Sequence, residues 1–130
     1  MKLMVCYDGS NVAKDAMGLA VKLGKQLGGS VNLVRSISAK RADDVVSVER
    51  IEADLESAAE QVAALGLHVD THLLIRGGSP GEDLTTFANE KRVDYIVIGI
   101  KRRSKVGKII FGSTAQYVIV KAACPVITVK

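Results

Sequence analysis

The sequence predicts an α/β protein, a three-layer α/β/α sandwich built on a five-stranded parallel sheet. Short apolar runs alternate along the chain with segments in which apolar residues recur at helical spacing. The apolar runs have the length and composition of strands that a parallel sheet buries on both faces. Strands and helices that alternate in this way form βαβ units with right-handed crossovers, and such units place helices on both faces of the sheet.

Length and composition set the limits of this prediction. A chain of 130 residues fits one domain, residues 1–130, with a core of its own. Apolar residues make up 48% of the chain and charged residues 25%, which are ordinary values for a globular protein and argue against disorder. The chain has no Trp and 4% aromatic residues, which argues against a nucleic-acid platform on which bases stack.

The first strand is expected at residues 3–7, an apolar run that ends at Asp8-Gly9-Ser10. A helix follows, because apolar residues recur at helical spacing until Gly28-Gly29 ends the pattern. Its predicted buried stripe consists of Ala13, Ala16, Ala20, Leu23 and Leu27. The second strand is expected at residues 31–37.

The middle of the chain continues the alternation. Residues 38–44 are polar and are expected to form a surface connection. The second helix ends at Gly66, and its predicted buried stripe consists of Val48, Ile51, Leu55, Ala58, Val62 and Leu65. Residues 67–75 alternate between apolar and polar, which indicates a half-exposed edge strand with His68 and His72 on its exposed face. Two histidines in that position are more often surface residues than metal ligands.

Two capping boxes mark the helices of the second half. Ser79-Pro80-Gly81-Glu82 combines a capping Ser with a Pro at the first helical position and a Glu three residues after the Ser. Ser113-Thr114-Ala115-Gln116 has the same form, so Ser113 is the expected N-cap of the last helix. A strand at residues 95–98 ends on Gly99 between the two helices, and the final strand is expected at Val126–Val129.

Candidate site residues stand at the carboxyl ends of the predicted strands. They are Asp8, Ser36 and Ile37, Arg76-Gly77-Gly78, and Gly99. Ligands of open parallel sheets bind outside these ends, at the point where the strand order reverses. Because these four separate stretches of sequence all stand at carboxyl ends of strands, we expect them to converge on one site.

A cluster of positive charge follows Gly99. Five cations lie between Gly99 and Gly112 with no acidic residue among them: Lys101, Arg102, Arg103, Lys105 and Lys108. They account for the net charge of +4, so the remainder of the chain is close to neutral. The segment leads into a helix N-terminus, where free N–H groups and the positive helix end attract anions. One local cluster suits a small polyanion such as a nucleotide better than a nucleic-acid duplex.

The two cysteines predict a reducing compartment. Cys6 and Cys124 lie far apart in the sequence, and neither has a CxxC or metal-type neighbour, so both are expected to be reduced thiols. No signal peptide or membrane span is visible in the sequence. We therefore expect a cytoplasmic protein without a membrane partner.

The sequence resembles the universal stress protein family along its whole length. The resemblance rests on Tyr7-Asp8-Gly9-Ser10, on Gly77-Gly78-Ser79-Pro80, and on the segment 93–99, VDYIVIG. The C-terminal part, from Phe111-Gly112-Ser113 to residues 123–129, ACPVITV, is similar to the family's C-terminal signature. The resemblance implies a Rossmann-like fold of the adenine nucleotide alpha hydrolase-like type, with strand order 3-2-1-4-5.

Many members of that family bind ATP or AMP through glycine, two residues, glycine, nine residues, glycine and then Ser or Thr. Gly99, Gly112 and Ser113 match this pattern, whereas Arg102 occupies the position of the middle glycine. The resemblance implies ATP or AMP as the ligand, with any Mg²⁺ carried by the nucleotide. The nucleotide-binding residues that follow from it are Tyr7, Asp8, Gly9, Ser36, Ile37, Ile98, Gly99, Lys101, Arg102, Arg103, Gly112, Ser113 and Thr114.

The resemblance also implies roles for these residues. Asp8 would lie near the ribose or the metal on the phosphates, and Ser36 would offer backbone groups to the adenine edge. Each position has a structural alternative as well. Asp8 is also suited to capping the first helix or shaping a turn, Gly99 to ending a strand, and Ser113 to capping a helix. The basic run also has an alternative interpretation as a solvated loop.

A homodimer through Val126–Val129 is expected, because this apolar edge strand has Lys130 as its sole guard and the resemblance implies the same interface. Three functions stay open. The first is a nucleotide-binding regulatory protein of the stress response, with no catalytic constellation and at most a slow ATPase activity. The second, favoured by Arg102, is a dimeric interaction protein that binds no nucleotide. The third is a nucleic-acid binder using residues 101–108, which the scarcity of aromatic residues opposes.

Overall fold

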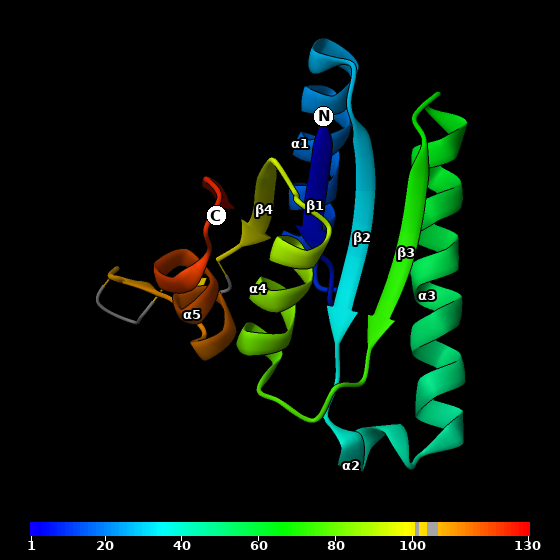
Figure 1. The fold of residues 1–130 in the computed structure, drawn as a ribbon, viewed down its shortest axis with the longest axis vertical. Coiled ribbons are helices and arrows are strands. Elements are labelled where there is room, and N and C mark those ends of the chain that lie inside the picture. Colours follow the sequence, from blue (N-terminus) through cyan, green and yellow to red (C-terminus); the bar gives the residue numbers. More distant parts are fainter. Residues whose placement is uncertain (101, 104–106) are drawn as a thin grey trace.

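The computed structural model describes residues 1–100, 102–103 and 107–130. Five parallel strands in this part of the chain form one sheet in the order β3-β2-β1-β4-β7. They are β1 (Lys2–Cys6), β2 (Ser30–Ser36), β3 (Val69–Leu74), β4 (Tyr95–Gly99) and β7 (Val126–Val129). The order is the predicted 3-2-1-4-5, and it reverses direction between β1 and β4 (Figure 1).

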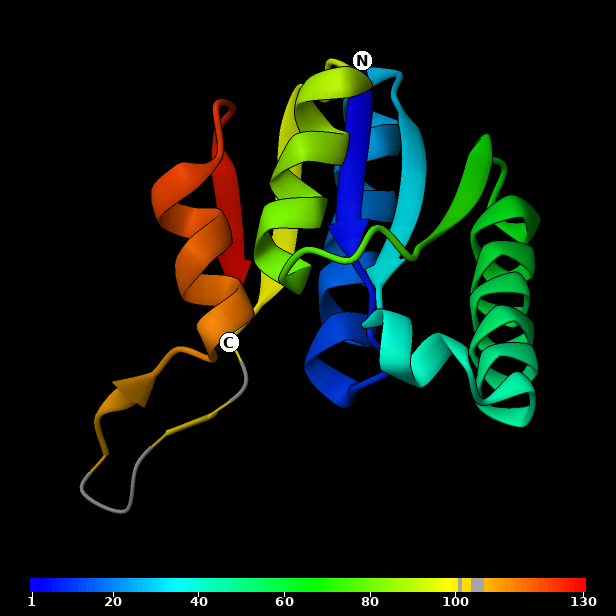
Figure 2. The same cartoon turned by 60° about the horizontal axis from the view of Figure 1, so that its bottom comes forward.

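Burial explains which strands are central. The side chains of Leu3, Met4 and Val5 in β1 are fully buried, as are Ile96 and Val97 in β4. Such runs must lie inside the sheet, with helices on both faces. β3 and β7 lie at the two edges and are more exposed, which confirms the edge position predicted for residues 67–75 and for the last strand (Figure 2).

Helices cover both faces of the sheet, so the predicted three layers are confirmed (Figure 1). One layer holds α1 (Asn11–Leu27) and α3 (Val45–Ala64), and the other holds α4 (Pro80–Glu90) and α5 (Ser113–Lys121). Alternate strand residues enter the two cores. Val5, Leu33 and Val97 pack with α1 and α3, and their neighbours Met4, Val34, Ile96 and Ile98 pack with α4 and α5.

Serine side chains begin two of these helices. Ser10 caps α1, its hydroxyl accepting a hydrogen bond from the N–H of Ala13. Ser79 caps α4 and accepts from the N–H of Glu82, with Pro80 as the first helical residue, which confirms this capping box. Each cap satisfies an N–H group that has no partner inside its helix.

The second predicted capping box is wrong. Gly112 is the N-cap of α5, with extended backbone (φ −64°, ψ 158°), and its carbonyl accepts from the N–H of Gln116 at 2.9 Å. Ser113 is therefore the first residue of the helix, one position later than a capping side chain needs. Glycine serves at the N-cap with little loss of stability relative to Ser.

Other expectations need correction. The polar connection 38–44 contains a short helix, α2 (Ala39–Ala42), and the basic segment contains two short antiparallel strands, β5 (Arg102–Arg103) and β6 (Ile109–Ile110). Leu27 and Leu65, expected in helical stripes, are exposed, because each stands at the end of its helix beyond the sheet.

His72 is not on an exposed face as expected. Its ring lies 4.7 Å from the ring of Phe87, centroid to centroid, and its Nε2 forms a hydrogen bond with Asn32 Oδ1 at 3.2 Å. The cause is α4, which covers this end of the edge strand and also buries Leu74. His68 is exposed, and its Nε2 lies 3.1 Å from Asp70 Oδ2.

Two further findings concern the cysteines and the helices. Cys6 and Cys124 are both free thiols. Among the described residues, none of the helices has the length and apolar character needed to cross a membrane.

Candidate functional site

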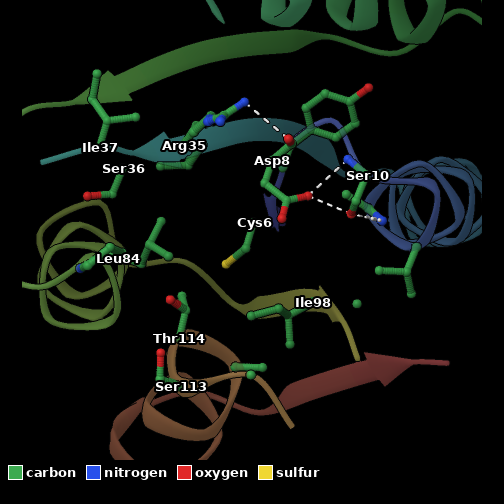
Figure 3. Close-up of a pocket in the computed structure, with 18 of the residues that line it drawn as sticks. Cys6, Asp8, Ser10, Arg35, Ser36, Ile37, Leu84, Ile98, Ser113 and Thr114 are labelled. Carbon is green, nitrogen blue, oxygen red and sulfur yellow. Dashed lines mark hydrogen bonds between the residues drawn. The ribbon is translucent and has the colours of Figure 1, made fainter. Parts of the chain in front are cut away.

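A pocket of about 460 Å³ opens at the carboxyl ends of β1, β2 and β4 (Figure 3). This is the point where the strand order reverses, so loops diverge there and leave space above the sheet. Its walls come from both helix layers. The lining residues are Cys6, Tyr7, Asp8, Ser10, Val12, Ala13, Val34, Arg35, Ser36, Ile37, Ser38, Arg41, Pro80, Leu84, Ile98, Gly99, Gly112, Ser113, Thr114 and Ala115.

The loop from β1 to α1 places Asp8 in the lining of this pocket. Asp8 Oδ1 accepts hydrogen bonds from the N–H of Ser10 at 3.0 Å and from its hydroxyl at 2.6 Å. The carboxylate therefore shapes the turn, and it also lines the pocket. Gly9 makes the turn possible with φ of 80°, and a Cβ there would lie 2.7 Å from Asp54 Oδ2. Gly9 itself is not among the lining residues of the described chain.

The end of β2 forms the wall opposite α5. The hydroxyl of Ser36 donates to Asp83 Oδ2 at 3.3 Å, and Asp83 is a buried residue of α4. The N–H of Ile37 donates to the carbonyl of Leu74 at 3.0 Å. The N–H of Ile37 is therefore used within the sheet, and the hydroxyl of Ser36, which donates to Asp83, is a polar group at this end of β2.

β4 and α5 form the second polar wall. A Cβ on Gly99 would lie 2.7 to 2.9 Å from three atoms of Val12, so the strand end approaches α1 as closely as glycine allows. Gly112, Ser113 and Thr114 stand at the start of α5 and line the pocket. The first N–H groups of a helix have no partner within it, and the helix dipole adds positive potential there. This wall can hold an anion.

Apolar residues lie between these walls. Val34, Leu84 and Ile98 are buried or nearly so and line the pocket from β2, α4 and β4. Cys6 joins them: burial, and secondarily the neighbouring carboxylate of Asp8, raises the pKa of its thiol to about 12. The thiol therefore stays protonated at neutral pH and behaves as an apolar lining group. Apolar surface of this kind suits the flat face of a base or another ring.

Two arginines that the sequence did not predict as site residues also line the pocket. Arg35 Nη1 donates to the carbonyl of Asp8 at 3.1 Å, and Arg41 of α2 donates from Nε to Ser47 Oγ at 3.3 Å. Arg35 directly precedes Ser36, a predicted site residue, so its position near the end of a strand could have indicated that it lines the site. Arg41 lies in a segment read as an ordinary surface connection. Nothing in its local sequence indicates that α2 would turn it toward the pocket.

Most of the predicted site residues meet in this pocket. Tyr7, Asp8, Ser36, Ile37, Ile98, Gly99, Gly112, Ser113 and Thr114 all line it. The prediction that Arg76-Gly77-Gly78 belongs to this site is wrong. These residues are absent from the described lining, and Arg76 Nη1 donates to Glu90 Oε1 at 2.7 Å instead. Lys101, and the side chains of Arg102 and Arg103, lie outside the described part of the chain.

The described residues contain no group of three or more His, Cys, Asp or Glu side chains placed to hold a metal ion. Among the described residues that line the pocket, Asp8 is the one carboxylate, and the start of α5 lines the same pocket. One carboxylate can share an Mg²⁺ whose other ligands are phosphates and water. The arrangement is therefore suited to binding an anionic ligand with an apolar portion.

Comparisons with known proteins agree with this fold. The model of the universal stress protein family matches residues 1–130. A universal stress protein of Thermus aquaticus is 29% identical over 98% of this chain and 97% of its own. A universal stress protein structure from Archaeoglobus fulgidus matches with a TM-score of 0.86 and 33% identity over 99% of this chain and 96% of the other. Another from that organism, in complex with dAMP, matches with a TM-score of 0.77 and 30% identity over 99% and 95%.

Proposed function

Because the chain belongs to the universal stress protein family, we propose that it is a regulatory protein that binds an adenine nucleotide, AMP or ATP, and acts in the stress response. The observation that carries this proposal is the two-part pocket. An apolar portion, formed by Val34, Leu84 and Ile98, adjoins the N-terminus of α5 at Gly112. A nucleotide has the same division into an apolar base and an anionic phosphate.

A related structure supports the choice of ligand. The Archaeoglobus fulgidus protein that is 30% identical to this chain was solved with dAMP. In the present chain, the first N–H groups of α5 and the hydroxyls of Ser113 and Thr114 would hold the phosphates. Lys101, Arg102 and Arg103 are proposed as counter-charges, with Arg102 in place of the glycine of the family pattern. Any Mg²⁺ would arrive on the phosphates of ATP and gain Asp8 as one carboxylate ligand.

The oligomeric state and the compartment are proposed from separate observations. We propose a homodimer through β7, because Val126–Val129 is an edge strand that pairs with β4 on one side in the described structure. An uncovered apolar edge tends to pair with another strand. We also propose that the protein works in the cytoplasm, where the free thiols Cys6 and Cys124 stay reduced.

The proposal is tested by titration calorimetry of the purified protein with AMP and with ATP, each with and without Mg²⁺. The test variant is Thr114→Glu, which places a carboxylate at the pocket end of α5. Its matched control is Gln116→Glu, which adds the same charge to the same turn at an exposed position outside the pocket lining. An acidic residue is tolerated in a first helical turn, so both variants should fold.

We expect Thr114→Glu to abolish nucleotide binding and Gln116→Glu to retain it. Absence of heat with either nucleotide at millimolar concentration would instead support the second candidate, a dimeric interaction protein without a nucleotide. The observation that favours that candidate is Arg102 at the position of the middle glycine.

A further inference from the structure

Arg35 and Arg41 form a second cationic wall in the pocket, separate from the N-terminus of α5. Arg35 comes from the end of β2 and Arg41 from the short helix α2, and both line the pocket. The proposed phosphate site at α5 has no need of them. We therefore asked what these two guanidinium groups could recognise.

Within the part of the chain that the structure describes, neither guanidinium is in an ion pair; the pairs His68–Asp70 and Arg76–Glu90 involve other side chains. Arg35 donates to the carbonyl of Asp8, and Arg41 donates to the hydroxyl of Ser47. Each guanidinium has five N–H donors in a planar fork, so both retain donors for a ligand.

The two charges also act on each other. Burial and the neighbouring charge of Arg41 lower the pKa of Arg35, and the carboxylates of Asp8 and Asp54 offset part of that effect. Two like charges near one another, one of them half-buried, are unfavourable, and an anionic ligand beside them would add to the compensation that the two carboxylates give. Guanidinium groups bind phosphate with paired, charge-assisted hydrogen bonds, so phosphate is the anion that fits best.

This wall lies across the pocket from the N-terminus of α5. Arg35 is two residues from Leu33 and from Ile37 and so shares a face of β2 with them, and their side chains belong to the core under α1 and α3. α5 covers the opposite face of the sheet. β2 and β4 are also separated by β1, which is about 10 Å at ordinary strand spacing. Figure 3 shows Arg35 and the pair Ser113 and Thr114 on opposite sides of the pocket, with Cys6 between them and Asp8 beside Arg35.

We propose that Arg35 and Arg41 bind a second phosphate, so that the ligand is an adenine nucleotide with a phosphate on the ribose 2′ or 3′ oxygen in addition to its 5′-phosphate. This proposal rests on the proposed function, because it places the 5′-phosphate at α5. The ribose, which joins both phosphates, then lies near Asp8, between the two arginines and the start of α5.

The test compares AMP with adenosine 3′,5′-bisphosphate and adenosine 2′,5′-bisphosphate by titration calorimetry. The variants are Arg41→Gln and Arg35→Gln, and the matched control is Lys40→Gln. Lys40 lies next to Arg41 in α2, is exposed, and is not among the pocket residues, so its substitution removes the same charge outside the site. Arg41→Gln is the decisive variant, because Arg35 also supports the loop at Asp8.

We expect one bisphosphate to bind the unmodified protein at least about tenfold more tightly than AMP, as a charge-assisted contact to phosphate implies. Arg41→Gln should abolish this gain, whereas Lys40→Gln should keep it. Equal affinity of the unmodified protein for AMP and both bisphosphates would overturn the inference and leave the proposed function intact.

Two other outcomes also decide the matter. If Arg41→Gln weakens ATP binding as much as bisphosphate binding, the arginines hold the 5′-phosphate chain and the inference is wrong. If the unmodified protein binds none of these ligands, the proposed function fails and the inference fails with it.

Discussion

The hydroxyl of Ser36 donates a hydrogen bond to Asp83 Oδ2 at 3.3 Å, joining two residues that are 47 positions apart in the sequence. Asp83 is 7% exposed and belongs to the first turn of α4, and Ser36 lines the pocket at the end of β2. The contact thus links the rim of the pocket to the start of a helix. Two predictions follow from it, one on stability and one on ligand choice.

Asp83→Ala is expected to lower the free energy of unfolding by about 2 kcal/mol. The substitution removes a hydrogen bond to a buried charged group and an acidic residue from a helical first turn. The measurement is urea denaturation. Glu82→Ala is the control, since Glu82 is an exposed acidic residue of the same turn, and its loss should cost less than about 1 kcal/mol. Equal losses would show that the contact with Ser36 contributes nothing.

The pocket is expected to prefer AMP over IMP. Because the Ser36 hydroxyl gives its proton to Asp83, it offers a lone pair to a ligand. The 6-amino group of adenine can donate to it, whereas the 6-oxo group of hypoxanthine cannot. We expect a preference of about tenfold, from one hydrogen bond to a polar group of the site. Ser36→Ala should bring the two dissociation constants together, and an undiminished preference in that variant would contradict this role.

Gly99→Ala is expected to destabilise the fold, by about 1–3 kcal/mol, because the new Cβ would lie within 2.9 Å of the carbonyl oxygen of Val12. Gly18 offers the opposite case, since it lies inside α1 with nothing within 4 Å of an added Cβ. Gly18→Ala should raise stability by about 0.5–1 kcal/mol. Thermal unfolding of both variants checks the contrast. A stable Gly99→Ala protein would mean that Gly99 is needed for the ligand alone.

Ser113→Ala and Ser79→Ala separate binding from capping. Ser113 is the first residue of α5 and lines the pocket, so its loss should weaken AMP binding with little change in stability. Ser79 caps α4 and is not among the pocket residues, so its loss should cost about 1 kcal/mol of stability and leave binding unchanged. Denaturation and calorimetry on both proteins make the test. If Ser113→Ala instead lowered stability and left AMP binding unchanged, Ser113 would act as a helix cap.

Stability is expected to fall as the pH drops below about 6.5, the ordinary pKa of histidine. Burial lowers the pKa of His72 in the folded state; Asp70 raises it and Lys91 lowers it further. Between the folded and unfolded pKa values the unfolded chain therefore takes up the proton, so stability is complete above 6.5 and is lost as the pH falls through the folded value.

The check is urea denaturation from pH 7.5 to 5. His72→Gln should remove this part of the pH dependence, whereas His68→Gln, which keeps His72, should retain it. A pH profile identical in the unmodified protein and His72→Gln would contradict the prediction.

Local patterns were enough to predict the architecture. The apolar runs, their alternation with helical stripes and the capping Ser79 are properties of neighbouring residues, and the sheet follows from them. Carboxyl ends of parallel strands meet at one edge, so Asp8, Ser36 and Gly99 could be expected to share a site before any contact was known. The strand order came from the family resemblance instead.

Other features depend on contacts between distant segments. The sequence by itself determined the α/β class, the family and the position of the site at the strand ends. Tertiary structure alone decided that Phe87 of α4 packs against His72, that Gly112 rather than Ser113 caps α5, and that Asp83 accepts from Ser36. It also decided that α2 brings Arg41 to the pocket beside Arg35. The physical reason is that periodicity records which face a residue takes on its own element, whereas packing and register determine which residue stands opposite it.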